Sequence, residues 1–190
     1  GTPRNVAALD DAIWTTDDTA NLVTRVDPST NALVAAIPVG TDAFKVAADT
    51  DQVWVTNNGD DTVSNVDPET DAVVATVPVG DAPQAVLIAA GSVWVSNVSD
   101  GTVSRIDPET DTVTSTIDIG TEASGLAFEA GFVWVAVTGE DKVVAVDPAT
   151  EEIVAEVTAG SRPTGLTAGA GAVWVTNTSS DTVTRIDPTG

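Results

Sequence analysis

Residues 53–68 read VWVTNNGDDTVSNVDP, in which two short runs of β-branched and aromatic residues flank the polar turn Asn58-Gly59-Asp60-Asp61. Such runs are typical of β-strands, and a turn rich in Asn, Gly and Asp between them is typical of a hairpin. The first run is apolar at three successive positions, Val53-Trp54-Val55, where a half-buried strand would alternate. We therefore expect a strand that is buried on both faces.

The same stretch recurs along the whole chain at a fixed period of 40 residues. The tryptophans are Trp14, Trp54, Trp94, Trp134 and Trp174. The aspartates of the Asp-Pro pairs are Asp27, Asp67, Asp107, Asp147 and Asp187. The chain divides without insertion or deletion into the units 1–40, 41–80, 81–120, 121–160 and 161–190.

Each unit predicts four short strands, which in the second unit cover residues 45–48, 53–57, 62–66 and 72–79. Amphipathic patterns of helical length are absent, which excludes a helical solenoid. Repeats of about 40 residues with four strands each are typical of propeller blades. We therefore predict one all-β domain over residues 1–190, a β-propeller of five blades with four antiparallel strands each.

The fifth unit ends after its third strand, so the last blade is expected to lack its outermost strand. Closure of the ring would then depend on packing of blade five against blade one. The third strand of that blade, residues 182–186, would be an open edge that favours self-association with another chain. The alternative is that the chain is a piece of a larger propeller, in keeping with a processed product, a fragment or a designed protein.

The repeated residues predict structural roles. We expect the five tryptophans to form the core between blades, because a propeller blade packs on its neighbours with both faces. In the turn after the third strand, the aspartate of each Asp-Pro pair is expected to accept a hydrogen bond from the backbone two residues on, while proline presets φ.

The chain carries 29 acidic and 7 basic residues, a net charge of −22. Such a surface repels phosphate, so nucleic acid is not expected as a partner and anionic membranes are disfavoured. High acid content with only two lysines also suits a protein from a salt-rich environment, where repulsion is screened. No apolar run is long enough for a membrane-spanning helix, so membrane insertion is not expected.

The chain resembles the YVTN β-propeller repeat family in the segments 55–57, 61–67 and 73–80, with Trp where the name-giving Tyr usually stands. It is also similar to virginiamycin B lyase-type propellers, through residues 165–175. The resemblance implies a propeller fold and an extracytoplasmic or cell-surface location. The lyase-type members use a catalytic His with a metal ion, and this chain contains no His, so the resemblance does not carry that activity over.

The units differ most in the turn from the fourth strand of one unit to the first strand of the next, which in a propeller rims the central channel. Three of the seven basic residues lie there. We predict a site for a small anionic ligand or a protein carboxylate at this rim, and its residues are Arg4, Lys45, Gln84, Glu122 and Arg162.

Catalytic constellations are not evident. His and Cys are absent, which removes the usual general base and the thiol nucleophile, and no pair of carboxylates stands out. We expect no cofactor and no metal site, apart from weak binding of divalent cations to the acidic turns. The residues favour a non-catalytic repeat module, serving as a binding unit or surface scaffold. The alternative is a lyase or hydrolase that acts at the channel mouth.

Overall fold

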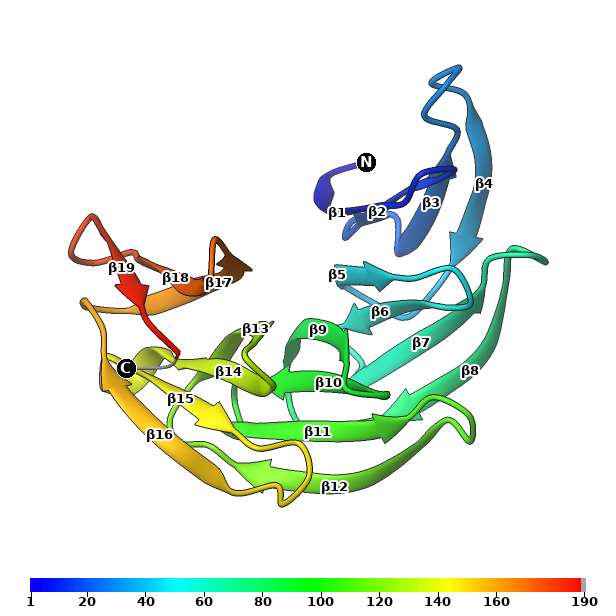
Figure 1. The fold of residues 1–190 in the computed structure, drawn as a ribbon. Helices are drawn as coiled ribbons and strands as arrows, with labels where there is room; N and C mark the ends of the chain where they lie inside the picture. The colour runs from blue at the N-terminus through cyan, green and yellow to red at the C-terminus, as the bar shows by residue number, and fades with distance from the viewer. Residues whose placement is uncertain (189–190) are drawn as a thin grey trace.

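The computed structural model describes residues 1–188, which form nineteen strands in five antiparallel sheets arranged around a common hub (Figure 1). Blade one comprises β1 (Pro3–Ala8), β2 (Ile13–Asp17), β3 (Leu22–Val26) and β4 (Leu33–Pro38). Blade two comprises β5 (Ala43–Ala48), β6 (Val53–Asn57), β7 (Thr62–Asp67) and β8 (Ala72–Pro78). Blade three comprises β9 (Pro83–Ala89), β10 (Ser92–Asn97), β11 (Thr102–Asp107) and β12 (Thr112–Asp118).

Blade four comprises β13 (Ala123–Glu129), β14 (Phe132–Val137), β15 (Lys142–Val146) and β16 (Ile153–Thr158), with a single 3-10 turn, η1 (Thr138–Glu140), between its second and third strands. Blade five comprises β17 (Pro163–Gly169), β18 (Ala172–Asn177) and β19 (Thr182–Ile186). The strands of each blade lie in chain order, and the first is innermost (Figure 1). The all-β propeller architecture, with a three-stranded fifth blade within the described residues, is confirmed.

The strand boundaries follow the sequence pattern closely. The second strand of unit two is found at the expected residues, Val53–Asn57, and all five of its residues are buried. The third and fourth strands, Thr62–Asp67 and Ala72–Pro78, end within one residue of the expected positions. The first strand begins earlier than expected, at Ala43, because its N-terminal half pairs with β6 through an irregular ladder.

The hydrophobic clusters lie between neighbouring blades, and each cluster is built from residues at the same positions of the 40-residue units. Trp14 and Val23 of blade one pack with Val53 and Val55 of blade two in one buried cluster. Equivalent clusters join blade two to three, three to four and four to five. Four tryptophans are buried, as expected, and are Trp14, Trp54, Trp94 and Trp134. The fifth, Trp174, is 37% exposed and does not fit the prediction of a core residue.

Four of the five Asp-Pro turns have the expected chemistry, and the partner expected for Asp187, residue 189, lies outside the described residues. Asp27 accepts hydrogen bonds from the backbone N–H and hydroxyl of Ser29, at 2.7 and 2.6 Å. These bonds hold the pKa of Asp27 at about 2, well below its usual value. The corresponding backbone bond, to the residue two positions on, is also accepted by Asp67, Asp107 and Asp147.

The five blades form an open arc and not a closed ring (Figure 1). Within residues 1–188, the main packing interfaces join blades that are consecutive along the chain. The outer faces of the two end blades are accordingly exposed: Val6 of blade one and Val183 of blade five are each 61% exposed, whereas Val63 and Val103 are fully buried. The expected closure of blade five against blade one is therefore wrong, because a gap separates the two blades.

The edge strand of blade five is β19, which pairs with β18 on one side. Its other edge carries no strand among the described residues, so self-association at this edge stays a prediction. No helix within residues 1–188 is long and apolar enough to cross a membrane.

Candidate functional site

The inner strands of all five blades line a cavity of about 440 Å³ at the hub of the arc. The side chains come from the fourth, fifth and sixth positions of the units. The sixth position supplies an apolar lining of valine and leucine, and Phe44 adds an aromatic ring. The polar lining residues are Asn5, Lys45, Gln84 and Thr164.

A β-bulge at the start of each inner strand presents these side chains to the cavity. In blade two the pairing of β5 with β6 shifts register between Ala43 and Val46, so Phe44 and Lys45 leave the regular ladder. Such bulges re-aim side chains and free the local backbone groups from strand pairing. The inner strands of the other four blades shift register near the same unit positions.

Side chains replace the missing ladder bonds and fix the inner strands. The buried hydroxyl of Thr56 accepts the backbone N–H of Lys45 at 2.9 Å and donates to the carbonyl of Gln84 at 3.5 Å. The amide oxygen of Asn5 accepts the backbone N–H of Val46 at 3.2 Å. The bonds from Thr56 to Gln84 and from Val46 to Asn5 cross from one blade to the next, so neighbouring blades hold the backbone around the cavity together.

Lys45 differs from most of the basic side chains because its charge is not paired with a carboxylate. Among the basic side chains that the structure describes, only Lys45 and Arg185 form no ion pair. Lys45 is half-buried in the cavity wall. None of the described residues that line the cavity carries a carboxylate. An unpaired cation beside amide, hydroxyl and aromatic groups is a suitable site for an anion that also carries hydrogen-bonding groups.

Arg4 lies at the rim and is neutralised by carboxylates. Its Nε is 2.6 Å from Asp18, and its Nη2 is 4.0 Å from Asp42. The guanidinium carbon of Arg4 also stacks 4.7 Å from the centre of the Phe44 ring. Arg4 therefore supports the aromatic wall of the cavity and does not offer a free charge to a ligand.

Glu122 and Arg162 form an ion pair with each other, at 3.2 Å, between the turns that precede blades four and five. Neither lines the hub cavity. Of the five residues predicted for the rim site, the structure brings together Lys45 and Gln84 in the cavity, and it places Arg4, Glu122 and Arg162 outside it. Whether any of the five binds a ligand stays a prediction.

Sequence reasoning missed Asn5, Phe44 and Thr164 as site residues, although all three occupy the variable unit positions that carry Lys45 and Gln84. These three residues could have been found from the sequence, because the fourth and fifth positions of the units vary from one unit to the next. The basic-residue signal selected Arg4 and Arg162 instead, and both of these are neutralised by nearby carboxylates.

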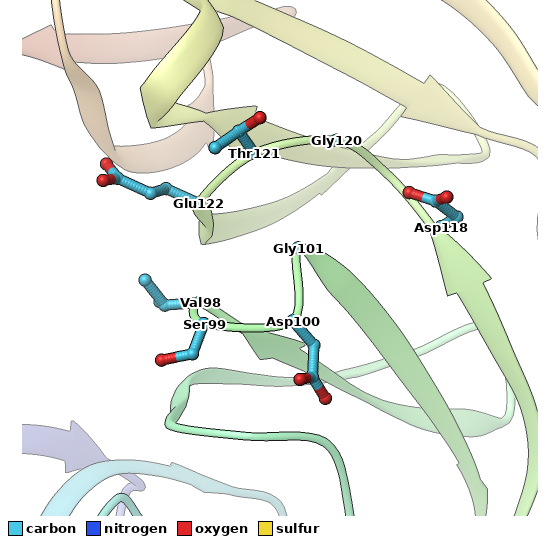
Figure 2. A pocket seen from close by; sticks show the side chains of 8 residues that line it. All are labelled: Val98, Ser99, Asp100, Gly101, Asp118, Gly120, Thr121 and Glu122. Carbon is cyan, nitrogen blue, oxygen red and sulfur yellow. The ribbon is translucent and has the colours of Figure 1, made fainter.

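A second hollow, of about 650 Å³, lies on the loop face between blades three and four and is shown in Figure 2. It is lined by Asp100, Asp118 and Glu122 among others (Figure 2). At the position of Gly101, other units carry Asn or Asp, as at Asn21 and Asp61. A Cβ on Gly101 would lie 2.2 Å from the carbonyl oxygen of Gly120, so a side chain cannot fit there without a backbone shift.

The carboxylates of the acidic turns mostly serve as backbone acceptors. Asp60 accepts the backbone N–H of Thr41 at 2.6 Å, and Asp61 accepts that of Ala82 at 2.9 Å across the blade boundary. Bonds from the Thr41 hydroxyl and N–H lower the pKa of Asp60. The Asp61 charge, desolvation and the Asp100 charge raise the pKa of Asp81.

No group of three or more candidate metal ligands occurs within residues 1–188. The predicted weak binding of divalent cations to these turns is untested. The acidic turns also have a structural role, because their side chains accept backbone N–H groups of the interblade turns. At residues 81–82, Asp61 and Asp100 hold the turn from the blades on both sides.

Comparison with known proteins confirms the fold. The chain is similar to the structure of a streptogramin B lyase, with a TM-score of 0.86 and 15% identity over 99% of this chain and 66% of the lyase chain. It is also similar to the hydrazine synthase of Kuenenia stuttgartiensis, with a TM-score of 0.60 and 13% identity over 97% of this chain and 95% of the other. At these identities the similarity is one of fold alone.

The chain spans 66% of the length of the lyase chain. No family model matches the sequence, and no curated protein is significantly similar to it.

Proposed function

We propose that this protein is a non-catalytic β-propeller module of the YVTN repeat type that binds a small carboxylate-bearing ligand at its hub. The observation that supports this most directly is Lys45, a half-buried cation without an ion pair in the wall of a cavity of about 440 Å³. The surrounding Asn5, Gln84 and Thr164 offer neutral hydrogen-bonding groups, and Phe44 offers an aromatic surface. Hydroxyl-rich carboxylates such as sugar acids match this combination.

With a net charge of −22, the protein is expected to bind an anion at one local site and not over its surface in general. The acidic surface repels anions at long range, and this repulsion is screened beyond about 10 Å at 0.1 M salt. A ligand must therefore gain its binding free energy from direct contact with Lys45 and its neighbours. We propose an extracytoplasmic or cell-surface location, which rests on the resemblance to YVTN proteins.

The alternative of a lyase or hydrolase at the same position has less support. Such chemistry needs a general acid or base beside the ligand. Lys45 is the single side chain with an acid–base group among the described residues that line the cavity. The lyase similarity concerns the fold and carries no catalytic residue over to this chain.

Calorimetric titration of the full chain with glucuronate tests the proposal, with glucose as the uncharged comparison, at about 0.15 M salt. We expect glucuronate to bind and glucose to bind at least about tenfold more weakly, since one charge-assisted hydrogen bond contributes about 1.5–3 kcal/mol. Lys45→Gln should remove this preference. Lys142→Gln is the matched control, because Lys142 is paired with Glu140 at 3.0 Å and lies outside the cavity.

Equal binding of both sugars, or unchanged glucuronate binding by Lys45→Gln, would contradict the proposal. Absence of binding by either sugar, with the protein folded, would also contradict the sugar-acid site.

A further inference from the structure

Three carboxylates meet where the chain passes from blade two into blade three, and we call Asp61, Asp81 and Asp100 the carboxylate cluster. The backbone N–H of Asp81 donates to Asp100 at 2.7 Å, and the N–H of Ala82 donates to Asp61 at 2.9 Å. The side chain of Asp81 is attached between these two amides. Its carboxyl group therefore lies beside both other carboxylates, and it is within hydrogen-bonding reach of Asp61.

The other three boundaries between blades carry one carboxylate at the same unit positions. These positions hold Asn21, Thr41 and Asp60 at the first boundary, Gly101, Thr121 and Glu140 at the third, and Asp141, Ser161 and Ser180 at the fourth. The counterpart of Asp81 is thus a hydroxyl in every case. The Thr41 hydroxyl donates to Asp60, and the Thr121 hydroxyl donates to Glu140 at 3.3 Å.

Asp81 cannot donate such a bond while it is ionised, because a carboxylate only accepts hydrogen bonds. The charge of Asp61, partial desolvation and the charge of Asp100 raise the pKa of Asp81. Among the described residues, no ion pair joins the carboxylate cluster to a basic side chain. Figure 2 shows the Asp100 carboxylate pointing away from Asp118 and Glu122, the other acidic side chains of the neighbouring hollow. The negative charges that face Asp81 are therefore those of Asp61 and Asp100.

The opposite face of this boundary, at the Asp-Pro turns, also lacks a cation. There the amide of Asn65 donates to Asp111 at 2.8 Å, whereas the boundaries before and after it have arginine–carboxylate pairs. At the hub, the bond from Thr56 to the carbonyl of Gln84 measures 3.5 Å across the boundary. No favourable ion pair between blades two and three thus offsets the repulsion within the carboxylate cluster in the part of the chain that the structure describes.

We propose that the boundary between blades two and three is an acid-responsive joint, in which protonation of Asp81 lets its carboxyl group donate a hydrogen bond to Asp61 and stabilises the contact between the two blades. The added proton takes the part of the hydroxyl hydrogen that Thr41 and Thr121 supply at other boundaries. It also removes one of three like charges.

The direction of the pH dependence follows from the raised pKa of Asp81. A carboxyl group whose pKa is higher in the folded protein stabilises the fold below its ordinary value of 3.8, and this contribution is lost as the pH rises through the folded pKa. The joint is therefore tighter in acid and looser at neutral pH. This local response is opposite in sign to that of Asp27, whose pKa is lowered.

A titration followed by the carboxyl ¹³C resonances of the aspartates tests the coupling of the charges. We expect the pKa of Asp81 to lie above 3.8 and to fall in Asp61→Asn. This variant keeps the backbone acceptor, because Asn21 accepts the equivalent bond at 2.9 Å between blades one and two. Asp141→Asn is the matched control, since Asp141 accepts the equivalent bond at 2.8 Å between blades four and five. It should leave the pKa of Asp81 unchanged.

Hydrogen exchange tests the effect on the contact between the blades. The amides of Ala82, Val98 and Ser99 form hydrogen bonds at this turn. Their protection factors, which correct for the intrinsic pH dependence of exchange, should rise at least about threefold from about pH 7 to about pH 4. Asp81→Thr should show the higher protection at both pH values. The internal control is the set of equivalent amides between blades one and two, those of Asp42, Asn58 and Gly59.

The proposal is overturned if Asp81 titrates at or below 3.8, or if Asp61→Asn and Asp141→Asn change its pKa equally. It is also overturned if protection at residues 82, 98 and 99 rises no more than at the control amides, or rises equally in Asp81→Thr. If Asp81→Thr does not fold, Asp61→Asn replaces it and should also lose the rise. Lys45→Gln should change none of these results, which keeps the test independent of the ligand site.

Discussion

The guanidinium of Arg105 lies 2.8 Å from the carboxylate of Glu151 and joins blade three to blade four. Both side chains are about a quarter to a third exposed, so the pair is screened in part and contributes about 1 kcal/mol. Arg105→Ala should therefore lower the free energy of unfolding by about that amount, measured by urea denaturation. Arg185→Ala is the matched control and should change it by less than about 0.5 kcal/mol. Equal losses in both variants would show that the interblade contact is not the cause.

The tryptophans offer a second comparison between internal and terminal blades. Trp54 is fully buried between blades two and three, so Trp54→Ala should destabilise the protein by about 3–5 kcal/mol. Trp174→Ala removes a side chain that is 37% exposed and should destabilise it by about 1–2 kcal/mol. Urea unfolding monitored by circular dichroism gives both values. A cost for Trp174 equal to that for Trp54 would contradict the open arc.

The Asp27 carboxylate makes the stability of the folded protein decrease as the pH falls into the acid range. Its pKa is about 2 in the folded protein, below the ordinary 3.8, because Ser29 donates two hydrogen bonds to it. The carboxylate therefore stabilises the fold fully above pH 3.8, and this contribution is lost as pH falls through about 2. Asp27→Asn should lower the melting temperature at neutral pH and reduce its fall between about pH 4 and pH 2.

The control for Asp27 is Asp51→Asn, at an exposed carboxylate that accepts no hydrogen bond from residues 1–188. Melting curves of this variant should follow those of the parent across the same pH range. An identical acid profile for Asp27→Asn and Asp51→Asn would rule out the turn as the source.

Thr56 connects the ligand cavity to stability. Thr56→Val leaves the backbone N–H of Lys45 without its acceptor, which should destabilise the protein by about 1–3 kcal/mol and weaken glucuronate binding. Thr15→Val is the contrasting change, because all four other units already carry valine at this position, as at Val55 and Val95. We expect this second variant to be neutral or stabilising. Calorimetry and thermal melting together test the pair, and a neutral Thr56→Val would contradict the role of the hydroxyl.

The net charge of −22 predicts stabilisation by salt. Raising KCl from about 0.1 M to about 2 M shortens the screening length from about 10 Å to below 3 Å, which weakens repulsion among the carboxylates. We expect the melting temperature to rise by more than about 5 °C. Sucrose at equal osmolality controls for general solute effects. A melting temperature independent of KCl would argue against a salt-adapted surface.

The repeat in the sequence was sufficient to predict the blades, because packing imposes the same residue types at the same positions in every unit. Val53–Asn57 is found as a strand at the expected residues, and four of the five tryptophans are buried as predicted. The exposure of Trp174 and the open arc have one cause, because within residues 1–188 no further blade packs against the free face of blade five. The repeated residues alone do not predict whether the first and last blades meet.

The candidate site was only partly predictable for a related reason. The unit positions that face the hub were identified, and Lys45 and Gln84 lie there. The prediction selected residues by charge, but charge alone does not show whether a side chain is already neutralised. Arg4 and Arg162 are paired with Asp18 and Glu122, contacts that join residues from different turns and become visible only in the folded arrangement.

Within residues 1–188 the main packing of each blade is on its chain neighbours, which makes this part of the molecule a linear array. A closed ring gains cooperativity because the loss of any one blade costs two interfaces, whereas a terminal blade of this array can detach at the cost of one. Unfolding should therefore begin by fraying at blades one and five and spread toward blade three. A perturbation in blade one should fade along the array before it reaches blade five, so the two ends behave as nearly independent units.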